Sequence, residues 1–400
     1  MKNVFDIVVV GAGMVGLTLV NLLARSEQQH ALRITLVDAG ARPEFKRENE
    51  ISLRVSAISA GSSEVLGRIG VWENIVAERS CPYRNMKVWD AAGSVDGPET
   101  LQFDAAEFAI PQLGSIVENI LIQHALLTAA EQTQVSIKFD TAIASMTKAA
   151  DRYSVLLGSG EKISADLLVG ADGANSFVRQ QAGILLKTWP YPQKAFVTHL
   201  RPEKSHNNTA WQRFLATGPI GLLPLSDGRV SIVWSTTPEL ADSALAATDE
   251  ELQTVLAAAT DDVLGKLTPS GPRGAFPLRA QHAEKYVLPG LALIGDAAHT
   301  VHPLAGQGVN LGFADAAALA LVIDAALTAG DNPGDLPALR RYERSRKSDN
   351  QTMLHFVDGL NRLFSNDSAP MARLRGAGMH LFNKSGPIRT QAVQVALGIN

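Results

Sequence analysis

The sequence predicts an α/β fold in which a Rossmann-like parallel-sheet domain carries an inserted antiparallel-sheet domain and a helical C-terminal region. Three observations support this prediction. The chain opens with a β-α-β pattern, apolar residues alternate in strands between Thr188 and Pro277, and the part from Leu336 onward has helical periodicity. Hydrophobic residues make up 46% of the 400 residues, so a chain of this length can bury a sizeable core.

The N-terminal pattern places a glycine loop between a strand and a helix. "FDIVVV" is a β-branched run, "MVGLTLVNLLARS" has helical spacing, and "LRITLVDAG" is a second strand that closes at Asp38. The loop from Gly11 to Gly16 reads G-x-G-x-x-G, which lets backbone N–H groups and a helix N-terminus approach a pyrophosphate. Asp38, 22 residues past Gly16, is placed to accept the ribose hydroxyls. The loop is predicted to bind FAD or NAD, and these residues do not separate the two.

Two later strands also end in an aspartate. "SADLLVGADGANSFVR" predicts a strand over 167–170 before Asp172 and Gly173, and "GLALIGDAAH" predicts another that ends at Asp296. Asp-Gly alone is a common turn. Because the carboxyl ends of parallel strands meet at one sheet edge, where ligands bind, we expect both aspartates beside the N-terminal loop. There Asp296 can accept a hydroxyl from a sugar or ribityl chain.

The stretch "GDAAHTVHPLAGQGVNLG" raises two alternatives, a metal site and a hydrolytic site. His299 and His302 lack the i, i+4 spacing of helical zinc ligands, and no second histidine and cysteine cluster accompanies them. No G-x-S-x-G nucleophile motif occurs. Gly306 and Gly308 instead precede an alanine-rich helix, whose N–H groups favour negative charge on a ring edge. We therefore expect no metal.

The inserted region and the C-terminal region are predicted from periodicity. "IGLLPL" and "RVSIVWS" are joined by Ser226-Asp227-Gly228, a strong hairpin signal. A helical pattern from Asp249 to Leu267 interrupts the strands. Near the C-terminus, apolar residues at helical spacing predict a face that packs inward: Met353, Phe356, Val357, Leu360 and Phe364.

Composition excludes several classes of protein. The net charge of -4, with acidic and basic residues interspersed, gives no footprint for nucleic acid. The single cysteine, Cys81, cannot form an internal disulfide and fits a reducing compartment. The apolar run 7–10 is too short for a signal peptide, and no long uncharged apolar run predicts a membrane span. We expect a cytoplasmic protein, with peripheral contact at the inner membrane left open.

Taken together, "GAGMVG", "GADGANSFVR" and "GDAAHTVHPLAGQGVNLG" resemble the motifs of the single-component FAD-dependent aromatic hydroxylases, in the same order and over almost the whole chain. "RVSAISAGSSEVLGRIGVWENI", "GLLPLSDGRVSIVW" and the C-terminal segment are similar to the ubiquinone-biosynthesis hydroxylases of that family. The resemblance implies four segments: 1–187 as the first part of the FAD-binding domain, with a short excursion to the substrate domain; 188–288 as the antiparallel-sheet substrate domain; 289–335 as the last part of the FAD-binding domain; and 336–400 as a helical region.

The resemblance also implies roles for individual residues. Arg54 lies near the flavin and its phosphates, and Asp296 hydrogen-bonds the ribityl chain. Asn119 stands where other members often carry an arginine or glutamine, and Pro303 falls where a backbone carbonyl faces the substrate hydroxyl; no catalytic side chain is implied. The residues expected to bind FAD are Gly11, Gly13, Met14, Val15, Gly16, Asp38, Arg54, Asn119, Asp172, Gly173, Asp296, Gly306, Gln307, Gly308, Val309 and Asn310.

The chemistry implied by the family is hydroxylation of a polyprenylated phenol in ubiquinone biosynthesis. FAD is reduced by NAD(P)H, a transient co-substrate since no second G-x-G-x-x-G occurs, and O₂ is captured as a C4a-hydroperoxide that oxidises the ring. Two alternatives remain, a hydroxylase of a small soluble aromatic compound and a non-catalytic flavin-binding assembly protein. A complex of ubiquinone-biosynthesis proteins and a homo-oligomer are open as partners, and the choice between NADH and NADPH is open too.

Overall fold

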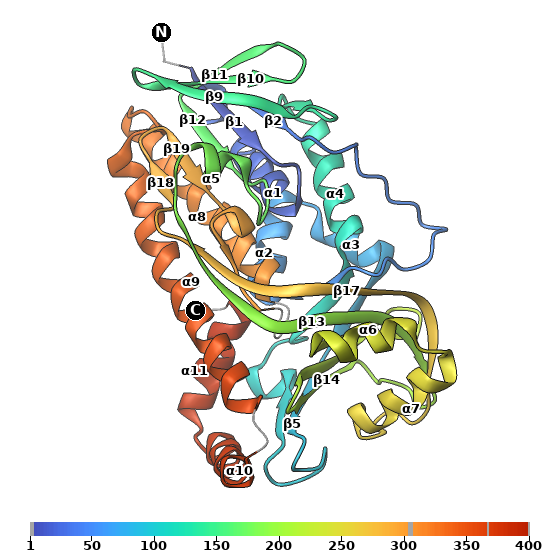
Figure 1. Ribbon diagram of the computed structural model, residues 1–400. Coiled ribbons are helices and arrows are strands. Elements are labelled where there is room, and N and C mark those ends of the chain that lie inside the picture. Colours follow the sequence, from blue (N-terminus) through green and yellow to red (C-terminus); the bar gives the residue numbers. More distant parts are fainter. Residues whose placement is uncertain (1–3, 303–306, 366–367, 399–400) are drawn as a thin grey trace.

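The computed structural model describes residues 4–302, 307–365 and 368–398 (Figure 1). Its first layer is a six-stranded sheet in which all neighbouring strands are parallel except β18 and β19. The β-branched run of β1 is buried towards its C-terminal end, as expected for a strand covered on both faces. The strands come from the beginning, middle and late parts of the chain, in the order β18 Val287–Leu288, β19 Leu291–Leu293, β12 Leu167–Gly170, β1 Phe5–Val10, β2 Leu32–Val37 and β8 Ser136–Lys138.

Helices cover this sheet and include the predicted alanine-rich helix. Helix α8 follows the late strand and packs against α1, with Phe313, Leu319 and Ile323 fully buried. By length and composition α8 could cross a membrane. Its buried side chains make it a core helix of this domain. The helices are α1 Met14–Ala24, α2 Ala60–Ile69, α3 Trp72–Arg79, α4 Asn119–Glu131, α5 Phe177–Gln181, α8 Gln307–Ala329 and α9 Leu336–Phe364, with short 3₁₀ turns at Gln29–Ala31, Ala105–Phe108 and Gly295–Ala297.

The second large layer is an eight-stranded sheet, antiparallel except where β14 meets β5. The predicted hairpin is confirmed, because β15 and β16 pair across the turn that contains Asp227 and Gly228. Strands β5 and β6 come from an early part of the chain, residues 85–104, and extend this sheet at one edge. The order is β20 His299–Thr300, β17 Leu267–Ala283, β13 Leu186–Pro202, β16 Val230–Thr236, β15 Gly218–Pro224, β14 Thr209–Leu215, β5 Asn85–Asp90 and β6 Leu101–Asp104.

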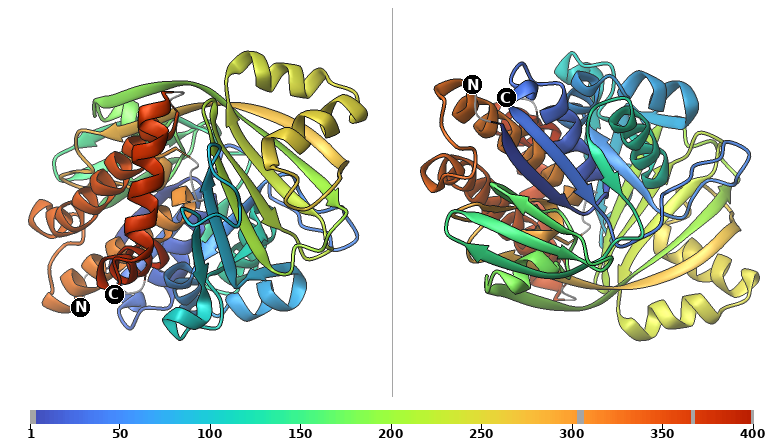
Figure 2. Two further views of the ribbon diagram at one scale, coloured as in Figure 1. Left: turned by 90° about the horizontal axis from the view of Figure 1, so that it is seen from below. Right: turned by 90° about the horizontal axis from the view of Figure 1, so that it is seen from above.

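Residue alternation gives this sheet two different faces. One face packs against α6 (Pro238–Ala246) and α7 (Asp249–Thr260), burying a cluster that includes Trp211, Ile232 and Trp234. The other face turns towards the first domain and the C-terminal helices (Figure 2). The predicted helix up to Leu267 was too long. It ends at Thr260 because Asp261 adopts a left-handed conformation with φ 57°, and Leu267 begins β17.

Two small sheets and two terminal helices complete the fold. The sequence patterns did not separate the three-stranded antiparallel sheets, which are β11 Lys162–Ala165, β10 Arg152–Leu157 and β9 Ile143–Ala149, and β3 Val55–Ser59, β7 Gly114–Glu118 and β4 Ser80–Tyr83. Helices α10 (Ala369–Asn383) and α11 (Pro387–Leu397) follow α9 in the chain, and α11 runs back towards the body, so that Gly398 lies beside Gly61 of α2 (Figure 1). On α9, the predicted inward face is buried at Val357 and Phe364 and half-buried at Met353 and Leu360, whereas Phe356 is 59% exposed.

Candidate active site

The glycine loop lies at the carboxyl end of β1, and close backbone packing fixes its shape. Gly11 has φ +107°, and a Cβ there would lie 2.3 Å from the carbonyl oxygen of Ala171 on the neighbouring loop. A Cβ on Gly16 would lie 2.0 Å from the carbonyl oxygen of Gly11. Gly13 faces open space, and no side chain of the described chain caps α1 behind it. The free N–H groups of this helix N-terminus suit a phosphate.

Asp38 helps to hold the loop in place. Its Oδ2 accepts the N–H of Ala12 at 2.6 Å, and its Oδ1 accepts the N–H of Gly40 at 2.7 Å. The carboxylate therefore ties the end of β2 to the glycine loop, in addition to the predicted contact with ribose. The side chain is half-buried and each oxygen retains a further lone pair for a hydroxyl donor.

The second loop lies beside the first, as the sequence predicts. Gly173 lines the large cavity described below, whereas the Asp172 side chain turns away and accepts the N–H of Val178 at 3.0 Å. Arg179 joins this loop to the third, because its guanidinium donates to the carbonyl oxygens of Ala174 and Ala297, each at 2.9 Å. Sequence reasoning missed this role of Arg179. In the sequence, Arg179 follows Ser176 by three residues, a spacing that indicates the start of a helix but not a contact with another loop.

The third loop brings Asp296 to the same edge of the sheet. Asp296 lines the cavity, and its side chain is accessible from it. Desolvation deep in the molecule raises the pKa of the carboxyl, and the nearby His299, Arg54 and Arg279 partly offset this rise. Arg54 also lines the cavity, and none of the described residues hydrogen-bonds its guanidinium. An unpaired arginine beside a phosphate-binding loop is suited to an anionic group.

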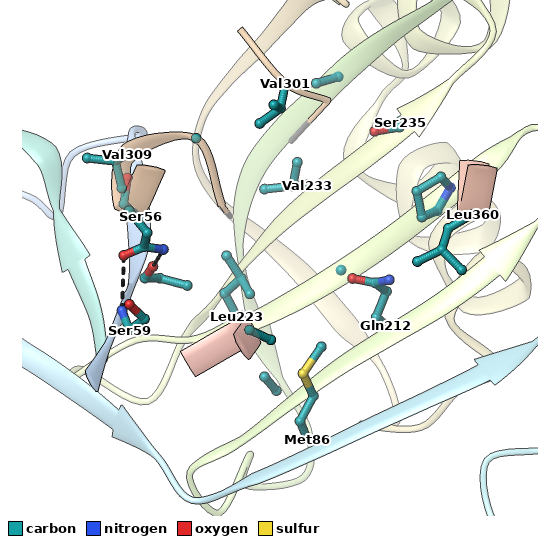
Figure 3. Close-up of a pocket in the computed structure, with 18 of the residues that line it drawn as sticks. Ser56, Ser59, Met86, Gln212, Leu223, Val233, Ser235, Val301, Val309 and Leu360 are labelled. Atoms are coloured by element: carbon teal, nitrogen blue, oxygen red, sulfur yellow. Dashed lines mark hydrogen bonds between the residues drawn. The ribbon is translucent and has the colours of Figure 1, made fainter. Parts of the chain in front are cut away.

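The N-terminus of α8 closes this end of the site. Gly308, Val309 and Asn310 line the cavity. The Asn310 amide also fastens α8 to β3, because it accepts the N–H of Ser59 at 3.1 Å and donates to the carbonyl of Ala57 at 2.9 Å (Figure 3). Pro303 and Gly306 lie outside the described residues, as does the side chain of Gln307.

Asn119 enters the site from the start of α4. Its side chain accepts a hydrogen bond from Ser56 at 2.7 Å, and its N–H donates to the carbonyl of Arg54 at 3.0 Å. Asn119 therefore orders the strand that carries Arg54. The adjacent Glu118 is buried and pairs with Arg79 at 2.7 Å, which anchors the same corner from the other side.

A buried carboxylate supports the third loop from beneath. Asp315 on α8 is fully buried, and its Oδ2 accepts the N–H of Gly295 at 3.1 Å and lies 2.5 Å from Nε2 of His299. Its Oδ1 accepts from Arg346 at 2.8 Å and from Asn350 at 3.1 Å, both on α9. Burial alone would raise the pKa of this carboxyl, but His299 and Arg346 lower it below its usual value.

The two histidines of the third loop therefore have different surroundings. His299 contacts the buried carboxylate of Asp315, whereas His302 packs edge-on against Tyr191, with ring centroids 5.0 Å apart. Burial lowers the pKa of His302 to about 4, so its ring is neutral at pH 7. The sequence suggests that these two histidines act as a pair, but in the structure their side chains contact different residues.

A cavity of about 1240 Å³, called the large cavity below, extends from these loops across the second face of the eight-stranded sheet to the C-terminal helices (Figure 3). Its walls are mainly apolar, with Leu223 and Val233 on the sheet and Leu360 on α9 among them. Gln212 points into it from β14, and none of the described residues hydrogen-bonds its side-chain amide. A cavity of this size with few polar groups suits a large apolar ligand.

The three loops and the adjoining cavity fit FAD. Free N–H groups at α1 face the place of a pyrophosphate, the unpaired Arg54 adds positive charge, and Asp38 and Asp296 provide hydroxyl acceptors. The N-terminus of α8 supplies a positive dipole where the ring system would lie. The fold and this donor set define an FAD-binding protein.

Comparison with known proteins agrees. Residues 4–357 match the family described as "FAD binding domain". The chain is 38% identical over 395 residues to 3-demethoxyubiquinol 3-hydroxylase of Escherichia coli (strain K12), covering 98% of each chain. It is 37% identical to ubiquinone biosynthesis monooxygenase COQ6, mitochondrial, of Xenopus tropicalis, covering 98% of this chain and 93% of the relative. Ubiquinone hydroxylase UbiL of Rhodospirillum rubrum is also 37% identical, with 99% and 90% covered. The chain belongs to the FAD-binding family and, within it, to the ubiquinone-biosynthesis hydroxylases, and its cofactor is FAD.

Solved structures share the fold at lower identity. PqsL of Pseudomonas aeruginosa, solved with 2-aminobenzoylacetate, has a TM-score of 0.78 and 22% identity, covering 94% of this chain and 99% of that one. HpxO of Klebsiella pneumoniae, complexed with FAD and uric acid, has a TM-score of 0.75 and 18% identity, covering 99% and 97%. These likenesses show that the chain shares their fold.

Proposed function

We propose that the protein hydroxylates the aromatic ring of a polyprenylated phenol in ubiquinone biosynthesis, with FAD, NAD(P)H and O₂. The observation that carries this proposal is the apolar part of the large cavity, which continues from the flavin-binding loops along the eight-stranded sheet to the C-terminal helices. The whole cavity, about 1240 Å³, includes the place of the flavin, and its walls beyond that place are mainly apolar. The names of the relatives, which refer to ubiquinol and ubiquinone, support the same substrate class.

FAD supplies the redox chemistry when bound, and the chain supplies its position. On this proposal the N–H groups behind Gly13 hold the pyrophosphate, Asp38 the ribose, Arg54 the phosphates and Asp296 the ribityl chain. The start of α8, including Val309, lies against the polar edge of the ring system and stabilises negative charge there through its dipole.

The sheet face forms the substrate side of the site. Val233 and Leu223 lie across the cavity from the start of α8, so a phenol ring between them is shielded from water (Figure 3). The Gln212 amide lies farther along the same face, where it can hydrogen-bond a ring oxygen substituent. The apolar remainder, reaching Met379 on α10 and Leu397 on α11, accommodates an isoprenoid tail.

The test measures FAD content first and then NAD(P)H oxidation with phenols that carry no, short or long prenyl chains, identifying products by mass spectrometry. We expect stoichiometric FAD and stimulation that increases with chain length, because each added methylene buries apolar surface. Val233→Trp is expected to abolish this stimulation by filling the ring end, while Val255→Trp, on the exposed surface of α7, leaves it unchanged.

Three outcomes would contradict the proposal. A chain that stays colourless with added FAD would exclude a flavoenzyme. Stimulation by unprenylated phenols alone would assign the enzyme to a small soluble aromatic compound. Bound FAD without stimulation by any phenol would favour a non-catalytic assembly protein.

On the proposed function the enzyme works from the cytoplasm at the inner membrane, where prenylated phenols reside.

A further inference from the structure

Exposed apolar side chains gather on the C-terminal helices. In the described chain, Leu381, Ile388 and Val395 are 70%, 67% and 55% exposed, on α10 and α11. Scattered single apolar residues on a surface are ordinary, but a concentration of them marks an interaction site. With these three, six exposed large apolar side chains of the described chain lie between residues 356 and 397: Phe356, Leu363, Leu374, Leu381, Ile388 and Val395.

The same helices differ from the rest of the chain in charge. Residues 368–398 contain four arginines and lysines and neither aspartate nor glutamate, although the whole chain carries -4. Two of the arginines hold the helices to the body, because Arg375 pairs with Asp90 at 2.7 Å and Arg389 with Glu107 at 2.5 Å.

The other two basic residues face outward. Arg373 and Lys384 are exposed, and no described residue forms a salt bridge with either. The nearby acidic side chain of Glu99 lies against Gly376 on α10. The exposed residues of α10 and α11 therefore combine large apolar side chains with a small positive excess, a combination that complements anionic headgroups.

The large cavity opens on these helices. Phe356, Leu363 and Leu374 line the cavity and are also 59%, 36% and 62% exposed, so they form its rim. Behind the rim, the walls continue with Phe364 and Met379 towards the sheet. The rim thus joins the apolar interior to the exposed apolar side chains of α10 and α11.

We propose that α10 and α11 form a docking face for an anionic phospholipid bilayer, made by Leu381, Ile388, Val395, Arg373 and Lys384. Docking places the cavity rim at the headgroup level, so an apolar tail passes from the bilayer into the cavity without crossing water. The identity of that tail rests on the proposed function, whereas the docking face rests on the exposed side chains themselves.

The experiment measures binding of the FAD-loaded enzyme to sedimented vesicles. One set contains phosphatidylethanolamine and phosphatidylglycerol, and the other contains phosphatidylcholine alone. The combined variant L381Q/I388Q/V395Q changes exposed residues that do not line the cavity. The matched control L185Q/L321Q/V76Q changes residues that are 68%, 63% and 46% exposed elsewhere on the molecule.

We expect the wild type and the control to bind anionic vesicles, and the docking-face variant to lose roughly tenfold or more in partitioning. R373Q/K384Q is expected to weaken binding to anionic vesicles by about fivefold per charge and to leave phosphatidylcholine binding unchanged. FAD content equal to that of the wild type shows that each variant is folded. Equal vesicle binding by the docking-face variant, or equal loss in the control, would overturn the proposal.

Other occupants of the face give different results. If a second copy covers it, sedimentation velocity will show a wild-type dimer that the docking-face variant dissociates, with no vesicle binding by either; that result would also overturn the proposal. A failure of the proposed function can be distinguished from a failure of the docking proposal, because phenol-stimulated NAD(P)H oxidation is measured with detergent-solubilised substrate and does not require vesicle binding. Vesicle binding without such oxidation would overturn the hydroxylase function and leave the docking face in place.

Discussion

Replacing Asp315 with asparagine tests whether a buried carboxylate holds the Asp296 loop in place. In the wild type, one oxygen of Asp315 accepts the N–H of Gly295 and faces His299, while the other accepts from Arg346 and Asn350. An asparagine keeps the size but replaces one carboxylate oxygen with an amide NH₂ group, which donates hydrogen bonds and cannot accept them. Two of the four contacts are therefore lost whichever way the amide turns, and the buried Arg346 loses its buried counter-charge.

The magnitude follows from the burial of the pair. Removing one partner of a buried ion pair costs about 3–5 kcal/mol, because the remaining charge stays out of water. Arg346 retains Asp349, at 3.0 Å on the exposed side, and Asn350, at 2.9 Å, so we expect about 3 kcal/mol. The remaining amide oxygen is expected to face the charged Arg346, which leaves the NH₂ group opposite the Gly295 N–H. This orientation loosens the loop that carries Asp296, and we expect FAD to bind about tenfold more weakly.

Urea unfolding followed by far-ultraviolet circular dichroism measures the free energy of unfolding, and quenching of flavin fluorescence measures the Kd for FAD. Asp349→Asn is the control, because that partner of Arg346 is 65% exposed and its loss is expected to cost at most about 1 kcal/mol. An Asp315→Asn protein with the wild-type unfolding midpoint and the wild-type Kd for FAD would refute the reasoning.

Further predictions concern the cofactor loop, the C-terminal helices and pH. Gly16→Ala places a Cβ 2.0 Å from the carbonyl oxygen of Gly11, so the purified protein is expected to lack FAD, measured as flavin absorbance per chain; full occupancy would contradict this. Asp90→Asn breaks the buried pair with Arg375 and is expected to cost about 3 kcal/mol and to speed proteolysis within α10; an unchanged cleavage rate would speak against the anchor. Burial lowers the pKa of three histidines to about 4, below the unfolded value of roughly 6.5, so the unfolded chain binds more protons between these values. The three histidines are His199, His282 and His302, and their contribution to stability is therefore full above about pH 6.5 and falls towards pH 4. Urea unfolding midpoints measured across this pH range test this prediction, and a midpoint that does not change with pH would contradict it.

Local pattern predicted the cofactor loops well because backbone geometry dictates them. A glycine is required at Gly11 and Gly16 whatever the distant sequence. The strands that end shortly before Gly173 and Asp296 follow from short apolar runs. Patterns failed where a boundary depends on one residue's conformation, as at Asp261, or where strands are short and half-exposed, as in β9 to β11. The segment boundaries at 187, 288 and 335 and the FAD-contacting residues stay predictions.

By itself, the sequence determined the α/β class, the three loops at one sheet edge and the family, since each rests on residues close together in the chain. Only the tertiary structure decided the partners of Asp315, because His299 comes from the third loop and Arg346 from a later helix. It likewise decided which face of the eight-stranded sheet lines the cavity, and that α9 to α11 close its far end. The physical reason is that a cavity and a buried ion pair are made by side chains far apart in sequence, and their positions exist only once the chain has packed.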